Sequence, residues 1–250
     1  LILLGSVNNK YFIDSKFFII KNLKLVGLSG LEKLDILLQL EQIKNKNIFY
    51  LPKKQIIAVA YEKFDFVKTF VQSMLNQSKK NWILTVIHDG PNKEFGQIME
   101  SYKKILPNNI NFENTSKRYN DYGHSLREMG LKNILGDYVL LTNADNYFVP
   151  GAIEILTEAL KKSSDNIDVI IFNFVASHHN YINFNTNYKR HFIDISSAIV
   201  KKELAEKAGF ADKSYDGDAT YFEDVAKVNQ KIQNKKLNIL KINRTLLVHN

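Results

Sequence analysis

Cysteine is absent from the chain, which excludes disulfide frameworks, thiolate metal sites and cysteine nucleophiles. Arginine is scarce, with only four in 250 residues, so lysine carries nearly all of the positive charge. Lysine lacks the planar fork that favours base recognition, and no nucleic-acid-binding motif is present, so a nucleic-acid partner is not expected. Long apolar runs are missing too, since none approaches the ~20 residues of a membrane-spanning helix.

The charge and composition are typical of a globular protein. The formal net charge is +8, and hydrophobic and charged residues make up 45% and 24% of the chain. Lysine and asparagine are spread along the whole chain, which indicates a solvated surface rather than a binding stripe. Attraction to anionic lipid, as in peripheral association with a membrane, or to a phosphorylated substrate is the alternative explanation.

Residues 1–54 differ from the rest and are expected to form an N-terminal segment of unknown role that ends in a linker. Phe17–Ile20 is compatible with a strand, and the apolar spacing over 30–40 is compatible with a helix. The stretch 44–54, rich in lysine and asparagine, indicates the linker. Residues 55–250 are expected to form one domain.

From residue 55 onward, short apolar runs alternate with helical patterns. The predicted strands cover 56–60, 82–87, 110–112, 138–141 and 169–174. The predicted helices cover 66–75, 98–105, 125–135 and the stretch that Pro150 opens, with later helices at 201–209 and around 225–232. This order predicts an α/β fold with a mainly parallel sheet and helices on both faces. Ligands of such sheets bind beyond the carboxyl ends of the strands, here the loops after Ala60, Ile87 and Leu141.

The loop after Leu141 is the most informative of the three. Its residues Thr142–Asn146 contain one carboxylate, Asp145, beside amide side chains. Carboxylate and amide oxygens suit Mg²⁺ or Mn²⁺, which commonly bridge a protein carboxylate to substrate phosphates. Alternatively, Asp145 and Asn146 cap the following helix or build its turn.

Several short motifs in a fixed order resemble glycosyltransferase family 2, whose members have the GT-A fold. The motifs are Gln77, His88-Asp89-Gly90, the stretch Asn120 to Arg127, the stretch Gly136 to Asn146, and Val149-Pro150. The resemblance runs from Gln55 to Leu160 and continues more weakly toward the C-terminus. It implies a GT-A-like domain with a nucleotide-sugar-binding half at 55–160 and an acceptor-side half at 161–250.

The resemblance also implies a nucleoside-diphosphate sugar as donor, with a UDP-sugar foremost. The donor-binding residues are then expected to be Tyr61, Asp89, Asn120, Arg127, Asn143 and Ala144. Asp89 matches the carboxylate that holds the base or ribose, and the alternative is a simple Asp-Gly turn. Arg127 matches a basic residue near the diphosphate, and the alternative is a surface ion pair. His124 is a further candidate for contact with a donor phosphate.

A divalent metal site follows from the same resemblance. Asn143-Ala144-Asp145 is similar to the D-x-D motif, whose last carboxylate binds Mn²⁺ or Mg²⁺, and here Asn143 replaces the first aspartate. His249 is the expected second metal ligand, since late histidines serve this role in several GT-A enzymes. A terminal surface histidine is the alternative, and surface or loop roles are expected for His178.

A general base is expected in the C-terminal half, where four carboxylates fall within nine residues. Glu223-Asp224 resembles the E-D motif, in which one carboxylate takes the proton of the acceptor hydroxyl. We expect this pair at the start of a helix, where interaction with the helix dipole is the alternative role. Asp218 is the rival candidate, and the sequence leaves all three open.

Together these features predict a metal-assisted, inverting glycosyltransferase that acts on a hydroxyl of a glycan or lipid-linked saccharide in bacterial surface polysaccharide synthesis. Its expected location is the cytoplasm, including the inner face of the cell membrane. A sugar-nucleotide pyrophosphorylase is one alternative, although the loop Tyr61–Phe64 lacks the expected glycine. A catalytically degenerate binding protein, suggested by Asn143, and a nucleic-acid-binding module, suggested only by the net charge, are the others.

Overall fold

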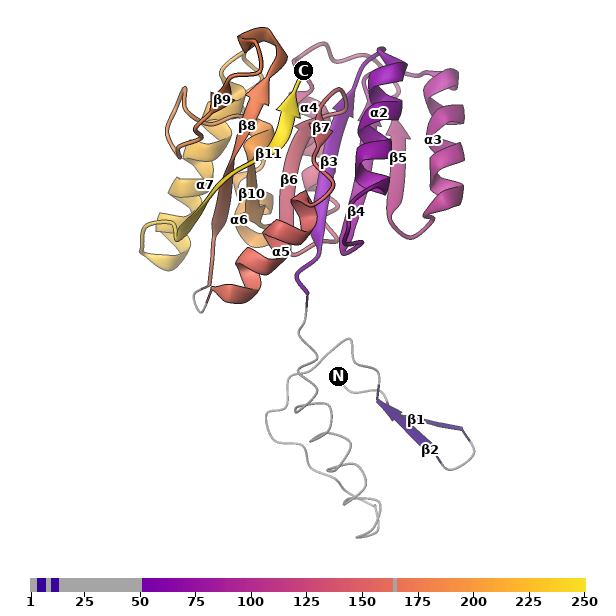
Figure 1. Ribbon diagram of the computed structural model, residues 1–250, viewed down its shortest axis with the longest axis horizontal. Helices are drawn as coiled ribbons and strands as arrows, with labels where there is room; N and C mark the ends of the chain where they lie inside the picture. Colours follow the sequence, from indigo (N-terminus) through magenta and orange to yellow (C-terminus); the bar gives the residue numbers. More distant parts are fainter. Residues whose placement is uncertain (1–3, 8–9, 14–50, 164–165) are drawn as a thin grey trace. The chain divides into compact units, whose positions relative to one another are not determined.

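The computed structural model describes residues 4–7, 10–13, 51–163 and 166–250, and the chain divides into two units at Tyr50 (Figure 1). In the first unit, β1 (Leu4–Val7) and β2 (Lys10–Ile13) form an antiparallel pair. The strand expected at 17–20 and the helix expected over 30–40 lie outside the described residues.

The second unit is built on one sheet with the strand order β5-β4-β3-β6-β10-β8-β11-β7, and β9 pairs with β8. Its strands are β3 (Lys54–Ala60), β4 (Trp82–His88), β5 (Ile110–Asn114), β6 (Tyr138–Asn143), β7 (Tyr147–Phe148), β8 (Val169–Ala176), β9 (Asn183–Phe184), β10 (Ala198–Lys201) and β11 (Ile239–His249). Strands β3 to β6 are mutually parallel, and β11 is parallel to β8. Strand β10 is antiparallel to both β6 and β8. The predicted α/β fold with a mainly parallel sheet is confirmed.

Helices pack on both faces of this sheet (Figure 1). One face carries α2 (Phe64–Leu75), α3 (Lys93–Ile105) and α5 (Ala152–Lys162), and the other carries α4 (His124–Leu131), α6 (Lys202–Ala208) and α7 (Gly217–Gln233). Strand β3 is buried along its whole length, with Ile56 and Ala58 in one core and Ile57 and Val59 in the other. A continuous apolar run is what a central parallel strand requires, because both of its faces are covered.

Three helix boundaries differ clearly from the prediction. Helix α3 begins at Lys93 rather than at residue 98. Helix α4 ends at Leu131 rather than near residue 135. Helix α7 begins at Gly217, so the acidic pair Glu223-Asp224 lies within the helix, and the predicted position at its start is wrong. The physical reason is the close approach at Gly217, where a Cβ would come within 2.6 Å of the Asp212 carbonyl oxygen, so glycine allows the helix to begin there.

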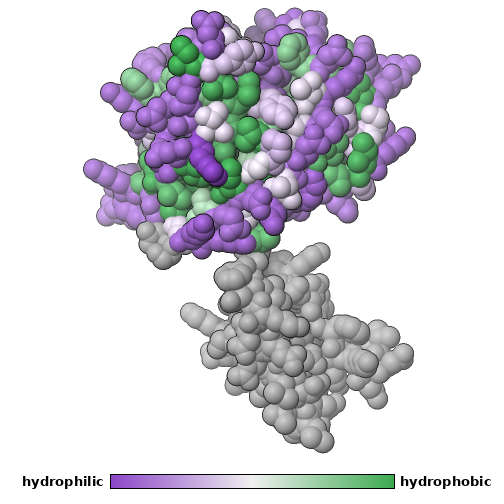
Figure 2. Space-filling view, in the orientation of Figure 1, coloured by the Kyte–Doolittle hydropathy of each residue, from purple (hydrophilic) through white to green (hydrophobic). Residues whose placement is uncertain are grey.

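The surface of the second unit is mainly polar on the face seen in Figure 2, with small apolar areas between hydrophilic side chains. Across the described parts of the chain, no helix combines the length and apolar character needed to cross a bilayer.

Candidate active site

A cavity of about 440 Å³ opens at the carboxyl ends of β3, β4 and β6. This is the edge of the sheet at which ligands of α/β folds bind. Its walls include most of the residues proposed to bind donor or metal: Tyr61, Asp89, Asn120, Asn143, Ala144 and Asp145. The fold therefore brings together residues that lie as far apart in sequence as the loop after β3 and the loop after β6.

Asp89 fixes one wall of this cavity. Its two carboxylate oxygens accept hydrogen bonds from the backbone N–H groups of Tyr119 (2.7 Å) and Asn120 (3.0 Å). Asp89 therefore does more than form its own turn, because it holds the loop that follows β5. Within that loop, the Arg118 guanidinium lies 3.7 Å above the ring of Tyr61 and donates a hydrogen bond to Asn120 Oδ1 (3.0 Å).

Arg127 is buried behind the cavity and is not among its lining residues. Its Nη1 donates to the Tyr122 carbonyl (2.8 Å) and to His124 Nδ1 (3.0 Å), and its Nη2 donates to Asn143 Oδ1 (2.6 Å). The alternative of a surface ion pair for Arg127 is therefore wrong. Burial lowers the pKa of Arg127, and the nearby carboxylate of Asp218 opposes this shift. Arg127 thus joins α4 to the end of β6.

The turn after β6 leaves one oxygen of Asp145 without a partner. Asp145 Oδ2 lies 3.3 Å from Lys63 Nζ, whereas its Oδ1 is buried and unpaired. Asn146 is fully buried and donates to Thr142 Oγ1 (3.1 Å) and Ser196 Oγ (3.0 Å), so it builds the turn. The capping alternative for Asp145 and Asn146 is wrong, because α5 begins at Ala152 and has no side-chain cap.

The residues around Asp145 can hold a divalent ion only if the substrate supplies further ligands. No group of three or more histidine, aspartate or glutamate side chains that could hold a metal occurs within the described residues. Asp145 offers the unpaired carboxylate oxygen, and Mg²⁺ or Mn²⁺ commonly takes one or two protein carboxylates together with substrate phosphates. The free oxygen at the cavity is the feature that such an ion would use.

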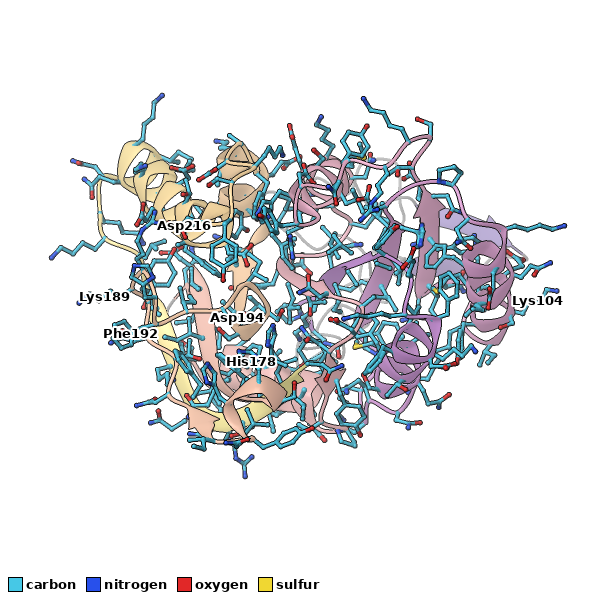
Figure 3. The ribbon with its side chains drawn as sticks, turned by 90° about the horizontal axis from the view of Figure 1, so that it is seen from above. Lys104, His178, Lys189, Phe192, Asp194 and Asp216 are labelled. Carbon is cyan, nitrogen blue, oxygen red and sulfur yellow. The ribbon has the colours of Figure 1, made fainter. Side chains whose placement is uncertain are left out.

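His249 lies near a different carboxylate. Its Nε2 is 3.7 Å from Asp194 Oδ2, and its ring is 5.4 Å from that of His178. Asp194 and His178 lie close together near the middle of the molecule when it is viewed from above (Figure 3). The His249 side chain is only 19% exposed and its Nδ1 is buried without a partner, so the alternative of a surface histidine is wrong.

Hydrogen bonds define the protonation of His124. Its Nε2 lies 2.9 Å from the Ser214 carbonyl oxygen, which can only accept, so this nitrogen carries the proton. Its Nδ1 is then the acceptor for Arg127 Nη1. Burial and the charge of Arg127 lower the pKa of His124 to about 4, so the ring is neutral at neutral pH.

This assignment leaves Asp218 without a hydrogen-bond donor. Asp218 lies in the first turn of α7, and its Oδ1 is 3.8 Å from His124 Nδ1, the nitrogen that carries no proton. Asp218 Oδ1 is buried and unpaired, and burial raises the pKa of this carboxyl group. A partly desolvated carboxylate with a free oxygen is well suited to accept a proton.

Glu223 and Asp224 are already engaged by basic side chains. Glu223 receives two hydrogen bonds from Arg190, at 2.7 and 2.9 Å, and this contact lowers the pKa of Glu223. Asp224 accepts a hydrogen bond from Lys227 Nζ at 2.8 Å. None of Asp218, Glu223 and Asp224 lines the cavity, so the three carboxylates differ in their partners rather than in contact with it.

Lys63, Arg118 and Tyr122 are among the cavity residues to which sequence reasoning gave no role. Lys63 lies in the loop after β3, one of the three loops that the strand-end rule selects, so that rule could have found it. Arg118 and Tyr122 lie in the loop after β5, which the same rule selects once β5 is accepted as a parallel strand.

Residues 55–211 match the family model described as Glycosyl transferase family 2. Among curated proteins, an uncharacterized glycosyltransferase of Rickettsia felis is 26% identical over 144 residues, which are 58% of this chain and 22% of that protein. The putative glycosyltransferase EpsH of Bacillus subtilis is 22% identical over 125 residues, which are 50% of this chain and 34% of that protein. The chain thus spans about a fifth to a third of the length of these two relatives.

Two solved structures share the fold. S. aureus TarS 1–349 in complex with UDP-GlcNAc has a TM-score of 0.64 and 15% identity, over 78% of this chain and 58% of that chain. The mannosyltransferase PcManGT from Pyrobaculum calidifontis in complex with GDP-Man and Mn²⁺ has a TM-score of 0.60 and 15% identity, over 85% and 64%. These likenesses confirm the GT-A fold that the motifs implied.

Proposed function

The chain belongs to glycosyl transferase family 2, and on this premise we propose that it transfers a sugar from a nucleoside-diphosphate donor to a hydroxyl of a glycan or lipid-linked saccharide. One observation carries the proposal: Asp145 beside the cavity and Asp218 beside His124 each keep a buried oxygen without a partner, a feature that they share among the carboxylates of the described residues with Asp121. Buried polar atoms are normally hydrogen-bonded, so unpaired carboxylate oxygens indicate atoms that bind or react with a ligand.

The donor is proposed to occupy the cavity at the strand ends. A volume of about 440 Å³ falls in the usual range for small-molecule sites. Lys63 and Arg118 bring positive charge to its walls, which suits a diphosphate. A UDP-sugar is the proposed donor, and the TarS complexes with UDP and UDP-GlcNAc support it. A GDP-sugar is the other candidate, because PcManGT is in complex with GDP-Man.

Asp145 is proposed to hold a Mn²⁺ or Mg²⁺ ion, with His249 retained as the second candidate ligand. Such an ion, when bound, offsets the negative charge that develops on the departing nucleoside diphosphate. Lys63 Nζ lies 3.3 Å from Asp145 Oδ2, so an ion that binds both carboxylate oxygens requires Lys63 to move away. Lys63 is 61% exposed, and its side chain can move without loss of core packing.

Asp218 is proposed as the base that takes the proton of the acceptor hydroxyl, with Glu223 and Asp224 as rivals. The neutral His124 beside it donates no proton to Asp218, so the carboxylate oxygen stays available. Arg127 holds His124 in this state through the hydrogen bond to Nδ1. Attack by the activated hydroxyl on the face opposite the leaving group would invert the anomeric configuration.

The biological setting is proposed from the membership of the family and from the charge of the chain. We propose a role in bacterial surface polysaccharide synthesis, with peripheral association at a membrane where a lipid-linked acceptor would be reached. The lysine-rich surface, with a formal net charge of +8, supports attraction to anionic lipid.

A thermal-shift panel tests the donor and metal roles together. Wild-type protein is heated with UDP-, GDP-, CMP- or dTDP-sugars, each with and without Mn²⁺. One donor should raise the Tm only when Mn²⁺ is present, because the ion and the diphosphate complete one site. Asp145→Ala should lose this shift, and Asp224→Asn is the matched control that should keep it.

Two results would count against the proposal. If no nucleotide sugar raises the Tm of the wild-type protein, the donor assignment fails. If Asp145→Ala keeps a full metal-dependent shift, Asp145 is not the metal ligand. If a separate assay with an acceptor detects no release of the nucleotide from the donor that binds, this result would favour a degenerate, non-catalytic member of the family.

A further inference from the structure

Two tyrosine side chains stand together at the rim of the cavity and have no part in the chemistry proposed above. Tyr122 is 64% exposed and Tyr215 is 80% exposed. Their rings meet edge to face with centroids 5.7 Å apart. A pair of large aromatic rings held together in solvent indicates a surface that another molecule covers.

The backbone of Tyr122 is strained in a way that fixes its ring. Its φ is +60°, in the left-handed region that a bulky side chain rarely adopts. The Arg127 guanidinium holds the Tyr122 carbonyl at 2.8 Å. The next residue, Gly123, packs so closely on Val59 that a Cβ would come within 2.6 Å of it. The backbone that carries the ring is therefore held in place by its surroundings, at the expense of local stability.

The segment that carries Tyr215 is also fastened to α4. Its neighbour Ser214 accepts a hydrogen bond from His124 Nε2 at 2.9 Å. Lys213 Nζ donates to the His124 carbonyl (3.3 Å) and to the carboxylate of Glu128 (2.7 Å). Both tyrosines are thus presented by segments tied to the same helix, so the geometry of the pair is preformed.

The pair lies between the donor cavity and the proposed base. Tyr122 lines the cavity, and its ring centroid is 5.8 Å from that of His124. His124 Nδ1 is in turn 3.8 Å from Asp218 Oδ1. Tyr215 is three residues before Asp218 in the chain. A molecule that covers the two rings can therefore present a hydroxyl group near Asp218.

We infer that Tyr122 and Tyr215 form a subsite for a pyranose ring of the acceptor, an inference that rests on the proposed function. A pyranose has apolar C–H groups on its faces and hydroxyls around its rim, so an aromatic ring binds its face and leaves the rim to polar groups. Tyrosine suits this task because it joins an apolar ring to a polar hydroxyl. Charged residues flank the pair, with Lys213 and Asp216 on either side of Tyr215, and this favours a saccharide over a lipid chain.

Saturation-transfer NMR tests the subsite without requiring turnover. The probes are the methyl β-glycosides of glucose, galactose and N-acetylglucosamine, each added with UDP and Mn²⁺, and glycerol is the acyclic control. At least one pyranoside should receive saturation on its ring protons, and glycerol should not. Tyr215→Ala and Tyr122→Gly should each weaken that binding by about tenfold or more, since rigid aromatic anchors dominate such contacts.

Tyr181→Ala is the matched control. Tyr181 is 62% exposed and has a φ of +58°, so it shares both features with Tyr122, but it does not line the cavity. Its removal should leave pyranoside binding unchanged. Tyr122→Gly relieves the backbone strain, so this variant should fold at least as stably as the wild type.

Three outcomes would overturn the subsite. In the first, Tyr215→Ala binds the pyranoside as tightly as the wild type does. In the second, the wild type binds no pyranoside. In the third, both variants lose UDP binding rather than pyranoside binding. The last result would assign the rings to the donor. Failure of the proposed function would give a different result. In that case the wild-type protein would bind no nucleotide sugar, but its pyranoside binding would still depend on Tyr215.

Discussion

Strand β3 has a lysine at or near each end, and the two lysines differ in burial and in the groups that they face. At the amino end, Lys54 is fully buried and its Nζ donates to Thr157 Oγ1 (2.5 Å) and the Pro52 carbonyl (2.8 Å). Beyond the carboxyl end, Lys63 is exposed and faces Asp145, which keeps one oxygen unpaired. Two protein acceptors hold the lysine at the amino end, which serves stability, whereas the unpaired oxygen of Asp145 at the carboxyl end is the atom that we expect to bind a ligand.

The largest effect is expected at the carboxyl end, in catalysis. Asp218→Asn should lower kcat by about 10³-fold, within the usual range for loss of a general base, because the amide cannot take the acceptor proton. Donor affinity should stay within about threefold, since the metal and diphosphate contacts are elsewhere. Steady-state kinetics with the donor found in the thermal-shift panel provides the measurement. A kcat equal to that of the wild type would remove Asp218 from the base role.

His124 should make the carboxyl end sensitive to acid. Its pKa is lowered to about 4 in the folded protein, against 6.5 in the unfolded chain. Between these values only the unfolded chain binds the proton, so the free energy of unfolding falls as the pH drops from 6.5 to 4, by about 3 kcal/mol in all. Urea denaturation of wild type and His124→Gln checks this. A difference between the two proteins that does not change over this pH range would contradict it.

Lys54 should make the amino end more stable in mild base. Burial lowers the pKa of Lys54 from 10.5 to about 7. Between these values the unfolded chain holds the proton that the folded state lacks, so the free energy of unfolding rises with pH. From pH 7 to pH 9 the gain relative to Lys54→Met should be about 2 kcal/mol. Parallel denaturation curves at the two pH values measure it, and an unchanged difference would mean that Lys54 stays charged when buried.

The smallest effect is expected for the acidic pair within α7. Glu223→Gln removes a partly exposed contact with Arg190, so it should cost at most about 1 kcal/mol of stability. Its kcat should stay within about twofold of the wild-type value, because Arg190 already holds both carboxylate oxygens of Glu223. Chemical denaturation and steady-state kinetics test both points. A large loss of kcat here, with normal activity in Asp218→Asn, would reverse the assignment of the base.

Much of the fold follows from local sequence patterns. The run Ile56–Ala60 is apolar on both faces, and it is the centre of the sheet because only a doubly covered strand buries such a run. Pro150 correctly predicted the position of α5, but it lies just outside the helix rather than in its first turn, since α5 begins at Ala152 with Gly151 as its N-cap. Short elements were harder: β10 is antiparallel and only four residues long, and its pairing depends on β6 and β8 rather than on its own sequence.

The sequence predicted where in the fold the candidate site lies, but not the contacts of its side chains. Asp89 and Asp145 were found because they follow strands whose carboxyl ends must meet. The buried position of Arg127 could not be read from the sequence, because its partners Tyr122, His124 and Asn143 come together only when α4 packs on the sheet. The same packing holds Tyr122 in its strained conformation.

The sequence by itself determined the alternation of strands and helices, and with it the edge of the sheet at which polar loops gather, because these depend on local periodicity and turn residues. Tertiary structure alone decided which carboxylate stays free. Asp218, Glu223 and Asp224 lie within one helix, and their environments are set by His124, Arg190 and Lys227. Two of these partners come from other parts of the chain, and burial and charge at a side chain depend on such distant neighbours, which local sequence does not specify.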